Sequence, residues 1–470
     1  MPLVAGVDSS TTACKVEVRD IESGAVVAVG RAPHPATSPP RSEQDPRDWH
    51  AAFAWACAEA GVSGAHRPVA LSIAAQQHGL VVLGADDEPL RPAKLWNDTE
   101  SAPDAAALVN ALPGGPADWA DACGSVPTAA FTISKLRWLR RCEPDVWRRV
   151  AKVFLPHDWL TFGLTGRPAT DRGDASGTGY WSPRSGTYRT DLLALVGDEV
   201  DWHTALPEVL APDAVAGEWA NTGIVVGAGT GDNMATALAL ALRPGDLVLS
   251  FGTSGTAFTV QEEPAADPTG TVAGFADAAG RYLPLVCTMN ATKVTDAAAR
   301  LLGVDHDRFD ALALAAPAGA GGLVLVPFLD GERTPNRPDA RGLMAGLRSD
   351  VEPEHLARAA VEGVVCNLLA GAESLGPTDG RVFLVGGAAR SAAYRHVVAD
   401  LTGRPVQVPE AQELVAAGAA VQAAALHLGC DFGAVTDTWG LRDGTEVEPD
   451  RAHDARAVRA AYAATVARLA

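Results

Sequence analysis

The sequence predicts an α/β protein built from two domains, and three observations support this fold class. Short runs rich in β-branched residues alternate with alanine-rich stretches of helical character. The chain has 470 residues, whereas single hydrophobic cores stop growing at about 250–300 residues. A segment near the amino terminus is echoed in the second half of the chain, which indicates two related domains. We place these domains at residues 1–238 and 239–470.

The apolar runs predict buried strands, because each is short and is bounded by turn residues. They are Leu3–Val7, Val69–Ile73, Gly223–Val226, Leu247–Ser250, Gly322–Val326 and Val382–Val385. The segment Ala32–Pro46 is rich in proline, serine and charge. We expect it to form an exposed loop leading into a helix around Trp49–Glu59.

Composition and charge exclude several classes of function. Hydrophobic residues make up 47% of the chain and charged residues 20%, which is ordinary for a globular protein. A formal net charge of −19 argues against sequence-independent binding to nucleic acid and against docking on an anionic membrane. We therefore expect small-molecule partners, with no nucleic acid and no membrane.

The cysteines and the amino terminus predict a cytoplasmic protein. Seven cysteines are scattered without a C-x-x-C pair, which excludes the usual spacing of structural zinc and is typical of reduced thiols. The amino terminus lacks a basic leader followed by an apolar stretch, and no run reaches the roughly 18 apolar residues of a spanning helix.

The echo joins Val4–Val16 to Val248–Val260, and each segment reads as a strand, a tight turn of small hydroxyl residues and a second strand. Such a turn presents backbone N–H groups and side-chain donors, which suit a polyphosphate. Either turn alone could be an ordinary β-hairpin turn without a ligand. The presence of two matching turns favours a nucleotide-binding role. No lysine follows a glycine, so the G-x-x-x-x-G-K-[ST] phosphate loop is excluded. The matched residues are Asp8, Ser9, Ser10 and Thr12 in the first turn, and Gly252, Thr253, Ser254 and Thr256 in the second.

A glycine-rich segment, Gly227–Asn233, follows one predicted strand and precedes an expected helix at Ala235–Leu242. Glycines allow the backbone and a ligand to approach closely. Asp232, near the start of the helix, would hold its carboxylate in a fixed position. The competing interpretation is that Asp232 only caps the helix, a role that Asp often fills.

Two further segments carry polar groups. Gln76-Gln77-His78-Gly79 ends a predicted strand, where open α/β sheets bind their ligands, and Trp96-Asn97-Asp98 adds an aromatic ring and polar groups typical of a sugar pocket. A lone histidine at such a place is more often structural. Near the end of the chain, Gly386 and Gly387 follow a strand, and a nucleoside could lie flat against their bare backbone.

These segments, in this order, resemble the FGGY carbohydrate kinases, and within them the xylulokinases, over nearly the whole chain. The resemblance rests on blocks that are individually weak but specific as an ordered set. They are Asp8-Ser-Ser-Thr-Thr, Gln76-Gln-His-Gly, Leu95-Trp-Asn-Asp, Thr132-Ile-Ser-Lys-Leu-Arg-Trp-Leu, Pro156-His-Asp-Trp-Leu, Asp174-Ala-Ser-Gly-Thr, Gly229-Thr-Gly-Asp-Asn, Gly252-Thr-Ser-Gly, Gly331-Glu-Arg-Thr-Pro and Gly386-Gly-Ala-Ala-Arg-Ser.

The resemblance implies the actin-like fold that hexokinases share, with two duplicated domains around a central cleft. It implies ATP and magnesium (Mg2+) as cofactors, with Asp232 as the catalytic base. The implied metal residue is Asp8, and the implied sugar contacts are Gln77, His78, Trp96, Asp232 and Asn233. The implied ATP contacts are Ser9, Ser10, Thr11, Thr12, Gly252, Thr253, Ser254, Gly255, Gly386 and Gly387.

The implied reaction is phosphorylation of D-xylulose to D-xylulose 5-phosphate, but this chain departs from the xylulokinase pattern on the sugar side. Glu100 stands where a basic residue is usual, and Ala-Ala-Gln-Gln stands before His78 where Ser-Gly-Gln-Met is commoner. Two alternatives follow: a kinase for another ketopentose or a pentitol, such as D-ribulose or an arabinitol, and an actin-like ATPase module without a sugar substrate. The sequence does not determine the oligomeric state, and a homodimer is among the assemblies it allows.

Overall fold

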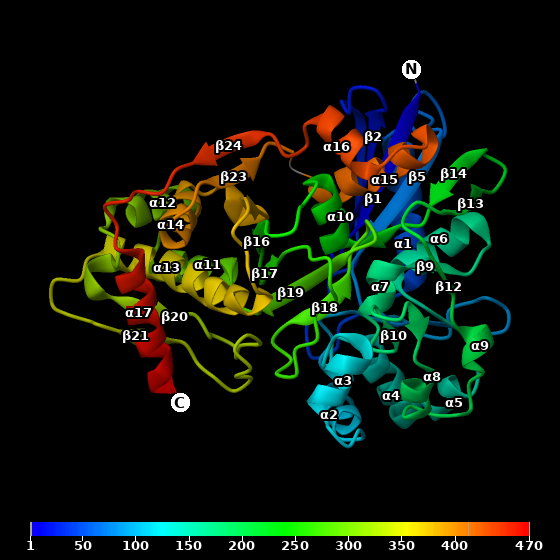
Figure 1. The fold of residues 1–470 in the computed structure, drawn as a ribbon, viewed down its shortest axis with the longest axis horizontal. Coiled ribbons are helices and arrows are strands. Elements are labelled where there is room, and N and C mark those ends of the chain that lie inside the picture. The colour runs from blue at the N-terminus through cyan, green and yellow to red at the C-terminus, as the bar shows by residue number, and fades with distance from the viewer. Residues whose placement is uncertain (1, 412, 470) are drawn as a thin grey trace. The chain divides into compact units, whose positions relative to one another are not determined.

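The computed structural model describes residues 2–411 and 413–469, which divide into two compact units (Figure 1). Unit 1 contains the chain up to Leu242 together with Gln261–Leu283 and Ala411–Leu441, and unit 2 contains Arg243–Val260, Pro284–Glu410 and the chain from Arg442 onward. Unit 1 thus takes in two segments that lie beyond residue 239, where the sequence analysis put the start of the second domain.

Unit 1 is built on a mixed sheet. Its strands β1, β5 and β14 run parallel, while β2, β3 and β13 run antiparallel to their neighbours. The valine-rich runs form these strands because β-branched side chains pack well on a pleated surface. In spatial order the strands are β13 (Val215–Trp219), β14 (Ile224–Gly227), β5 (Ala70–Ala75), β1 (Leu3–Ser9), β2 (Ala13–Asp20) and β3 (Val26–Pro33), with the short β15 (Thr230–Gly231) also pairing with β5.

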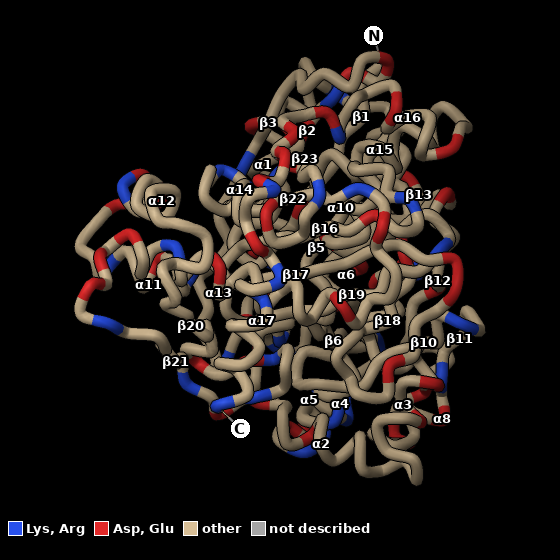
Figure 2. The backbone as a smooth tube through the Cα atoms, turned by 60° about the vertical axis from the view of Figure 1, so that its left-hand side comes forward, with Lys and Arg blue, Asp and Glu red and all other residues tan. Residues whose placement is uncertain are grey.

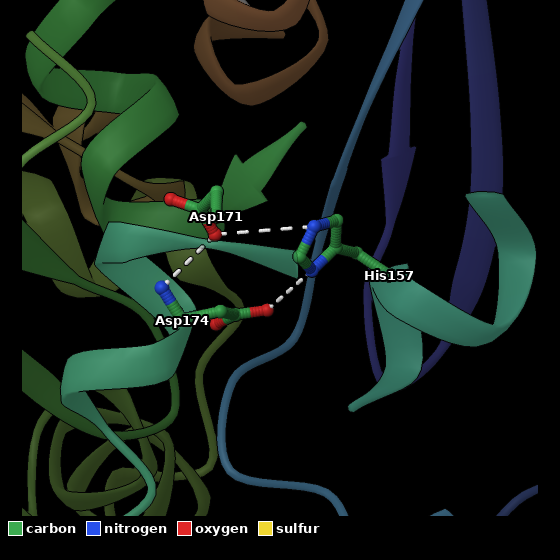
Figure 3. A group of neighbouring side chains, drawn as sticks. All are labelled: His157, Asp171 and Asp174. Carbon is green, nitrogen blue, oxygen red and sulfur yellow. Dashed lines mark hydrogen bonds and ion pairs between the residues drawn. The ribbon is translucent and has the colours of Figure 1, made fainter. Parts of the chain in front are cut away.

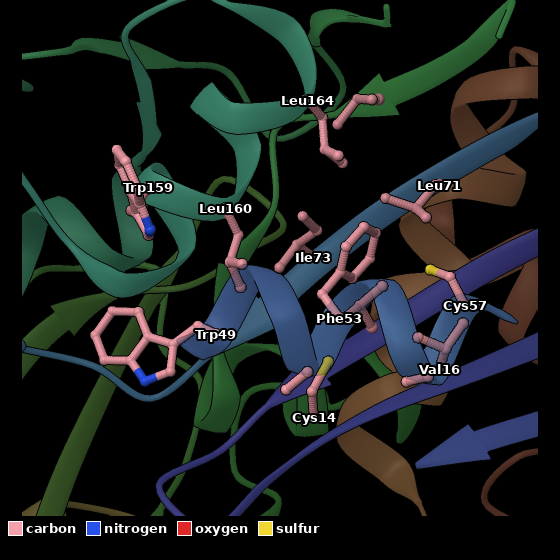
Figure 4. Packing of buried hydrophobic residues seen from close by; sticks show 14 of the residues in the cluster. Cys14, Val16, Trp49, Phe53, Cys57, Leu71, Ile73, Trp159, Leu160 and Leu164 are labelled. Carbon is pink, nitrogen blue, oxygen red and sulfur yellow. The ribbon is translucent and has the colours of Figure 1, made fainter. Parts of the chain in front are cut away.

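Helices cover both faces of this sheet. On one face, Trp49 and Phe53 of α1 (Pro46–Glu59) pack in a cluster with Leu71 and Ile73 of β5 (Figure 4). On the other face lies α15 (Leu414–Leu428), so close that a Cβ added at Gly6 would lie 1.9 Å from the backbone oxygen of Ala416. Since successive residues of a strand point to opposite faces, Asp8 shares the face of Gly6.

The remaining elements of unit 1 include a group with α2, α3, α4, α8 and β10 that lies apart from the central strands of this sheet (Figure 1). The helices are α2 (Ala102–Val109), α3 (Pro116–Cys123), α4 (Thr132–Cys142), α5 (Pro144–Trp147), α6 (Pro156–Thr165), α7 (Arg172–Ser176), α8 (Thr190–Ala194), α9 (Trp202–Ala205), α10 (Asp232–Ala239) and α16 (Phe432–Trp439). The short strands are β4 (Glu43–Gln44), β6 (Val81–Leu83), β7 (Ala93–Lys94), β8 (Lys152–Phe154), β9 (Ala169–Asp171), β10 (Trp181–Ser182), β11 (Thr187–Tyr188), β12 (Glu208–Leu210) and β18 (Ala273–Ala276).

Unit 2 has its own mixed sheet, in which β16 pairs antiparallel with β17 and parallel with β22. The order is β19 (Tyr282–Thr288), β17 (Gly255–Phe258), β16 (Leu247–Phe251), β22 (Val382–Val385), β23 (Val406–Pro409) and β24 (Gly444–Val447). The buried α13 (Pro353–Ala372) packs against the other main helices. The remaining elements are α11 (Thr292–Leu302), α12 (His306–Ala315), α14 (Ala392–Thr402), α17 (Ala455–Val466), β20 (Val324–Val326) and β21 (Leu343–Ala345).

The structure confirms most of the predicted local elements. Both segments of the echo form antiparallel hairpins, β1–β2 and β16–β17. The expected exposed loop at 32–46 is wrong at both ends, because residues 32–33 belong to β3 and residues 43–44 form β4, and the side chains of Ala32 and Gln44 are buried. The predicted run 322–326 becomes a strand only at Val324, because Gly321 and Gly322 adopt positive φ angles. The predicted helix at 235–242 begins earlier, at Asp232.

Charge and hydrophobicity are spread through the chain. Acidic and basic residues lie along the elements of both units rather than in one tract (Figure 2). Among the described residues, no single helix is long and apolar enough to cross a membrane; α15 and α16 pass that test only as a pair, with a bend of 118° between them. All seven cysteines are free.

Candidate active site

The predicted residues of unit 1 gather where parallel strands end. The carboxyl ends of β1 and β5 meet in register at Ser9 and Ala75, and β15 brings Gly231 against the same Ala75. Asp8 precedes the first of these positions, Gln77 follows the second and Asp232 follows the third. The sheet therefore brings the predicted metal, sugar and catalytic residues of this unit to one edge, where open α/β sheets bind ligands.

Asp232 is the first residue of α10, and the N-cap position belongs to Gly231. The Oδ1 atom of Asp232 accepts hydrogen bonds from the backbone N–H and the Nδ2 of Asn233, both at 2.8 Å. Dense packing around this half-buried carboxyl and then the negative charge of Asp8 raise its pKa to about 7. Because Gly231 holds the N-cap position, the interpretation of Asp232 as the N-cap is wrong. A raised pKa at a strand end is also typical of functional carboxyls.

Asp8 is buried beside a cation that the sequence analysis did not assign to the site. Lys15 lies directly opposite Asp8 in the β1–β2 ladder. Its Nζ is 3.4 Å from Oδ2 of Asp8 and 2.6 Å from Oε2 of Glu413, just before α15. Burial raises the pKa of Asp8 to about 6, and Lys15 opposes the rise. The spacing of Asp8 and Lys15 on the two strands of a tight hairpin could have indicated from the sequence that the two residues are paired.

Thr11 connects the first hairpin turn to the sugar side of the predicted site. Its hydroxyl donates to Oε1 of Gln76 at 3.1 Å and accepts from Nε1 of Trp96 at 2.9 Å. The backbone oxygen of Thr11 accepts from Nε2 of the buried Gln44 at 3.0 Å. The neighbouring Ser10 hydroxyl donates to the backbone oxygen of Ala13 within the turn. Two residues predicted for different ligands, Thr11 and Trp96, are thus in direct contact.

Three residues near these strand ends carry buried polar atoms that have no hydrogen-bond partner within the described part of the chain. They are Asp8 (Oδ1), Gln77 (Nε2) and Asn97 (Oδ1). The side chain of Gln77 lies against Gly231, where an added Cβ would be 2.7 Å from its Cδ. Because buried polar groups in native proteins are nearly always paired, these unpaired atoms are candidate contacts for a ligand.

His78 adopts a positive φ of 66°, unusual for a residue other than glycine. Its Nδ1 is 2.7 Å from the backbone oxygen of Gly177, and its ring stacks on Phe131 at a centroid distance of 5.1 Å. The backbone oxygen of His78 accepts from the ammonium of Lys135 at 3.1 Å. Lys135 is fully buried, and burial lowers its pKa to about 7. Lys135 therefore holds the strained backbone at His78, a role that its position in α4 did not suggest.

Glu100, the departure noted on the sugar side, belongs to an ion cluster around the fully buried Lys94. The Nζ of Lys94 lies 2.6 Å from Glu100, 2.9 Å from Asp98 and 3.1 Å from Glu43. It also lies 3.8 Å from the centre of the Trp138 ring. The three carboxylates are near enough to hold a metal ion, but the ammonium of Lys94 already occupies the position between them.

In unit 2, the predicted phosphate turn and the predicted adenosine residues lie at one edge of the sheet. Ser250 pairs in register with Val385, so Gly252 and Gly386 both follow the carboxyl ends of parallel strands. The backbone N–H of Gly252 bonds to the oxygen of Ser254 at 3.0 Å. A Cβ at Gly387 would meet nothing within 4 Å, whereas one at Gly255 would lie 2.7 Å from Thr288. Gly387 therefore presents uncrowded backbone, whereas Gly255 is also closely packed against Thr288.

Comparisons with known proteins agree with the geometry. The N-terminal domain model of the FGGY family of carbohydrate kinases matches residues 3–239, and its C-terminal domain model matches residues 247–427. The chain is 48% identical over 454 residues to a xylulose kinase of Streptomyces coelicolor, covering 94% of this chain and 92% of that protein. It is 47% identical over 458 residues to a xylulose kinase of Streptomyces rubiginosus, covering 95% and 92%.

A solved structure extends the comparison. The crystal structure of xylulose kinase from Bifidobacterium adolescentis superposes with a TM-score of 0.85 at 38% identity, covering 99% of both chains. These similarities confirm the fold class expected from the sequence, a two-domain kinase of actin-like type with mixed α/β sheets.

Proposed function

Because this chain belongs to the FGGY family of carbohydrate kinases, we propose that it transfers the γ-phosphoryl group of ATP to a hydroxyl of D-xylulose and forms D-xylulose 5-phosphate. Relatives at 47–48% identity are xylulose kinases. The observation that carries the mechanism is the carboxylate of Asp232, which starts a helix at the strand ends of unit 1 and has a pKa raised to about 7.

Asp232 is the proposed general base. A positioned base works best when its pKa lies near the working pH, and the raised pKa of Asp232 meets this requirement. Two hydrogen bonds from Asn233 fix Oδ1, so the second oxygen is the proposed acceptor for the proton of the attacking hydroxyl. Phosphoryl transfer needs position and charge neutralisation more than covalent help from the protein.

The proposed sugar contacts are Gln77, His78, Trp96 and Asn233, and we add Asn97. The unpaired Nε2 of Gln77 can donate to a sugar oxygen, and the unpaired Oδ1 of Asn97 can accept from a hydroxyl. The indole of Trp96 is held by Thr11, so its ring has a fixed orientation. A polar pocket of this kind orients a small substrate through a few well-placed groups.

Asp8 suits magnesium, because its buried Oδ1 has no partner among the described residues and carboxylate oxygen is a preferred Mg²⁺ ligand. When bound, the ion would neutralise phosphate charge. Lys15, opposite Asp8 in the ladder, is the proposed cation for the phosphates, with Ser9, Ser10, Thr11 and Thr12 supplying donors in unit 1. In unit 2 the proposed ATP contacts are Gly252, Thr253, Ser254, Gly255, Gly386 and Gly387.

Three further properties remain predictions of this proposal. The expected partners are the sugar and ATP, without nucleic acid or membrane. A cytoplasmic location is supported by the free state of all seven cysteines. A homodimer stays a prediction that sedimentation of the purified enzyme would test.

A coupled assay of ADP release with D-xylulose, D-ribulose and an arabinitol tests the substrate. We expect kcat/KM for D-xylulose to exceed the others at least about tenfold, a difference of about 1.4 kcal/mol in transition-state binding. A preference for D-ribulose or the arabinitol would support the proposed kinase activity but contradict D-xylulose as its substrate. ATP turnover without sugar, undiminished in His78→Ala, would instead support the ATPase module.

The mechanism is tested by Asp232→Asn beside Asp198→Asn, a matched change at an exposed aspartate. Loss of the base should lower kcat at least roughly a hundredfold, while calorimetric binding of Mg-ATP persists. Asp198→Asn should keep wild-type kcat. Near-normal turnover in Asp232→Asn would remove Asp232 from the mechanism.

A further inference from the structure

A cluster of one histidine and three aspartates lies fully buried in unit 1, and none of its members belongs to the proposed site. Figure 3 shows three of them, His157, Asp171 and Asp174. His157 and Asp158 lie in the first turn of α6, Asp171 ends β9, and Asp174 lies in α7. Burying three carboxylates together is unfavourable unless a positive charge accompanies them. Among the described residues, the histidine is the only basic side chain that pairs with these carboxylates.

Both nitrogens of the His157 ring face oxygen atoms. Nδ1 is 2.8 Å from Oδ2 of Asp174, and Nε2 is 3.3 Å from the backbone oxygen of Ala228. A carboxylate and a carbonyl are both acceptors, whereas a neutral imidazole has only one N–H to donate. With Asp174 ionised, both hydrogen bonds therefore form only if the ring is doubly protonated.

The charged groups around the ring favour the same state. Asp158 lies 3.2 Å from Nδ1, and Asp171 lies 3.9 Å from Nε2. Burial alone would lower the pKa of His157, but Asp158, Asp174 and Asp171 outweigh it and raise the pKa to about 10. The charge of Asp232 reaches Asp174, so the cluster and the proposed base also interact electrostatically.

The ring also supports the turn that carries Asp232. Gly229 has a φ of 78°, and a Cβ added there would lie 2.6 Å from Cδ2 of His157. On the same turn, the Thr230 hydroxyl donates to Oδ2 of Asp171 at 3.0 Å. Asp171 in turn accepts from the backbone N–H groups of Gly173 and Asp174. The turn between β14 and α10 is thus bonded at Ala228 by His157 and at Thr230 by Asp171.

We propose that His157 is a permanently protonated imidazolium that fixes the turn Ala228–Gly231 and so positions Asp232 for catalysis. His157 is a positioning residue, since it acts on the proposed base through this turn, and the inference rests on the proposed role of Asp232. A displacement of the base by about 1 Å can lower a rate about a hundredfold. The 2.8 Å distance between Nδ1 and Asp174 is that of a hydrogen bond, so a proton rather than a metal ion joins them.

The protonation state is tested in the wild-type enzyme without any activity measurement. Of the 11 histidines, the resonances of His157 are assigned by their loss in His157→Gln. In ¹⁵N spectra we expect both ring nitrogens to remain protonated from about pH 6 to about pH 9, whereas an ordinary histidine loses its second proton near about 6.5. A neutral tautomer at about pH 8 would overturn the proposal. So would a stoichiometric metal ion in the purified enzyme that is absent from His157→Gln.

The positioning role is tested by a neutral and a charged replacement. His157→Gln should lower kcat about 10- to 100-fold with the KM for ATP within about twofold of wild type. His157→Lys, which keeps a donor with positive charge, should recover at least about a fifth of wild-type kcat. Wild-type kcat in the Gln variant, or equal losses in two folded variants, would refute positioning. If Asp232→Asn kept its activity, the proposed base would fail, while the spectroscopic result would stand independently.

Discussion

The two hairpins β1–β2 and β16–β17 have the same topology but differ in charge. In each unit the first strand pairs antiparallel with the second and parallel with a strand from later in the chain, β5 or β22. The first hairpin carries Asp8 and Lys15 face to face, and Asp232 is near enough for the charges of the two carboxyls to interact. The second hairpin has no charged residue from Leu247 to Val260.

This difference in charge shows that the shared hairpin backbone and the charged side chains make separate contributions. Both turns follow the carboxyl end of a central strand, so both can present backbone N–H groups to phosphate. Only the first also carries a carboxylate, the proposed ligand of a cation, and an ammonium, the proposed partner of phosphate. On this proposal one duplicated backbone has two unequal roles, and the residues at the echoed positions Asp8 and Gly252 distinguish them.

The largest expected effect comes from changing Asp8 and Gly252 in two separate variants. Asp8→Ala should lower kcat about 10²–10³-fold, since it removes the proposed metal ligand and with it the neutralisation of phosphate charge. Gly252→Ala should lower kcat/KM for ATP less than about tenfold, because its added Cβ would meet only Ser254 at 3.6 Å. Steady-state kinetics at several Mg²⁺ concentrations measure both. Equal losses of activity in Asp8→Ala and Gly252→Ala would contradict the proposal that the two turns have different roles.

Removing the ammonium of the first hairpin should have the next largest effect. Lys15→Met should raise the KM for ATP about tenfold, because Asp8 and Glu413 would then face the phosphates without their cation. Lys152→Met, at a surface lysine paired with Asp87, is the matched control and should keep wild-type kinetics. An unchanged KM in Lys15→Met would assign that lysine a purely structural role.

The carboxyls of Asp8 in the first hairpin and of Asp232 at the start of α10 also predict a pH dependence. The pKa values of Asp8 and Asp232 are raised to about 6 and about 7, so the native state holds these protons more tightly than the unfolded chain. Their contribution to stability is complete below about pH 4 and is lost as the pH rises through about 6–7. Asp232→Asn should therefore raise Tm, by at most about 2–4 °C per kcal/mol in a chain of this length, and more at about pH 8 than at about pH 5.

Thermal unfolding of the free enzyme measures this gain, with Asp198→Asn as the control. The same ionisation makes kcat/KM rise with pH, with an apparent pKa near about 7, because the base must be ionised to accept a proton. A Tm gain that is independent of pH would show that the raised pKa is not its cause.

The smallest expected effect concerns Gly387 in unit 2, whose hairpin carries no charged residue. Gly387→Ala should fold normally, since its added Cβ meets nothing within 4 Å, yet it should raise the KM for ATP about two- to fivefold if adenosine lies against this backbone. Gly64→Ala, also at an uncrowded glycine, is the control. Identical kinetics in both variants would exclude Gly387 from the nucleotide site.

Much of the fold could be predicted because it depends on local patterns. Short valine-rich runs and the small residues between them determined the strands and both hairpin turns, and the order of the motifs indicated the kinase family. These signals are local because side-chain alternation and turn chemistry act over a few residues. They also placed Asp232 directly after a glycine turn, where the structure begins α10.

The tertiary structure alone decided which distant residues share an environment. Lys15 meets Glu413 across 398 positions of the chain, His157 reaches the turn at Ala228 across 71, and Lys135 reaches the backbone of His78 across 57. No periodicity encodes such pairs, because they form only when the sheet and its helices bring the segments together. Their pKa values depend on burial and on neighbouring charges, and both are properties of the folded chain.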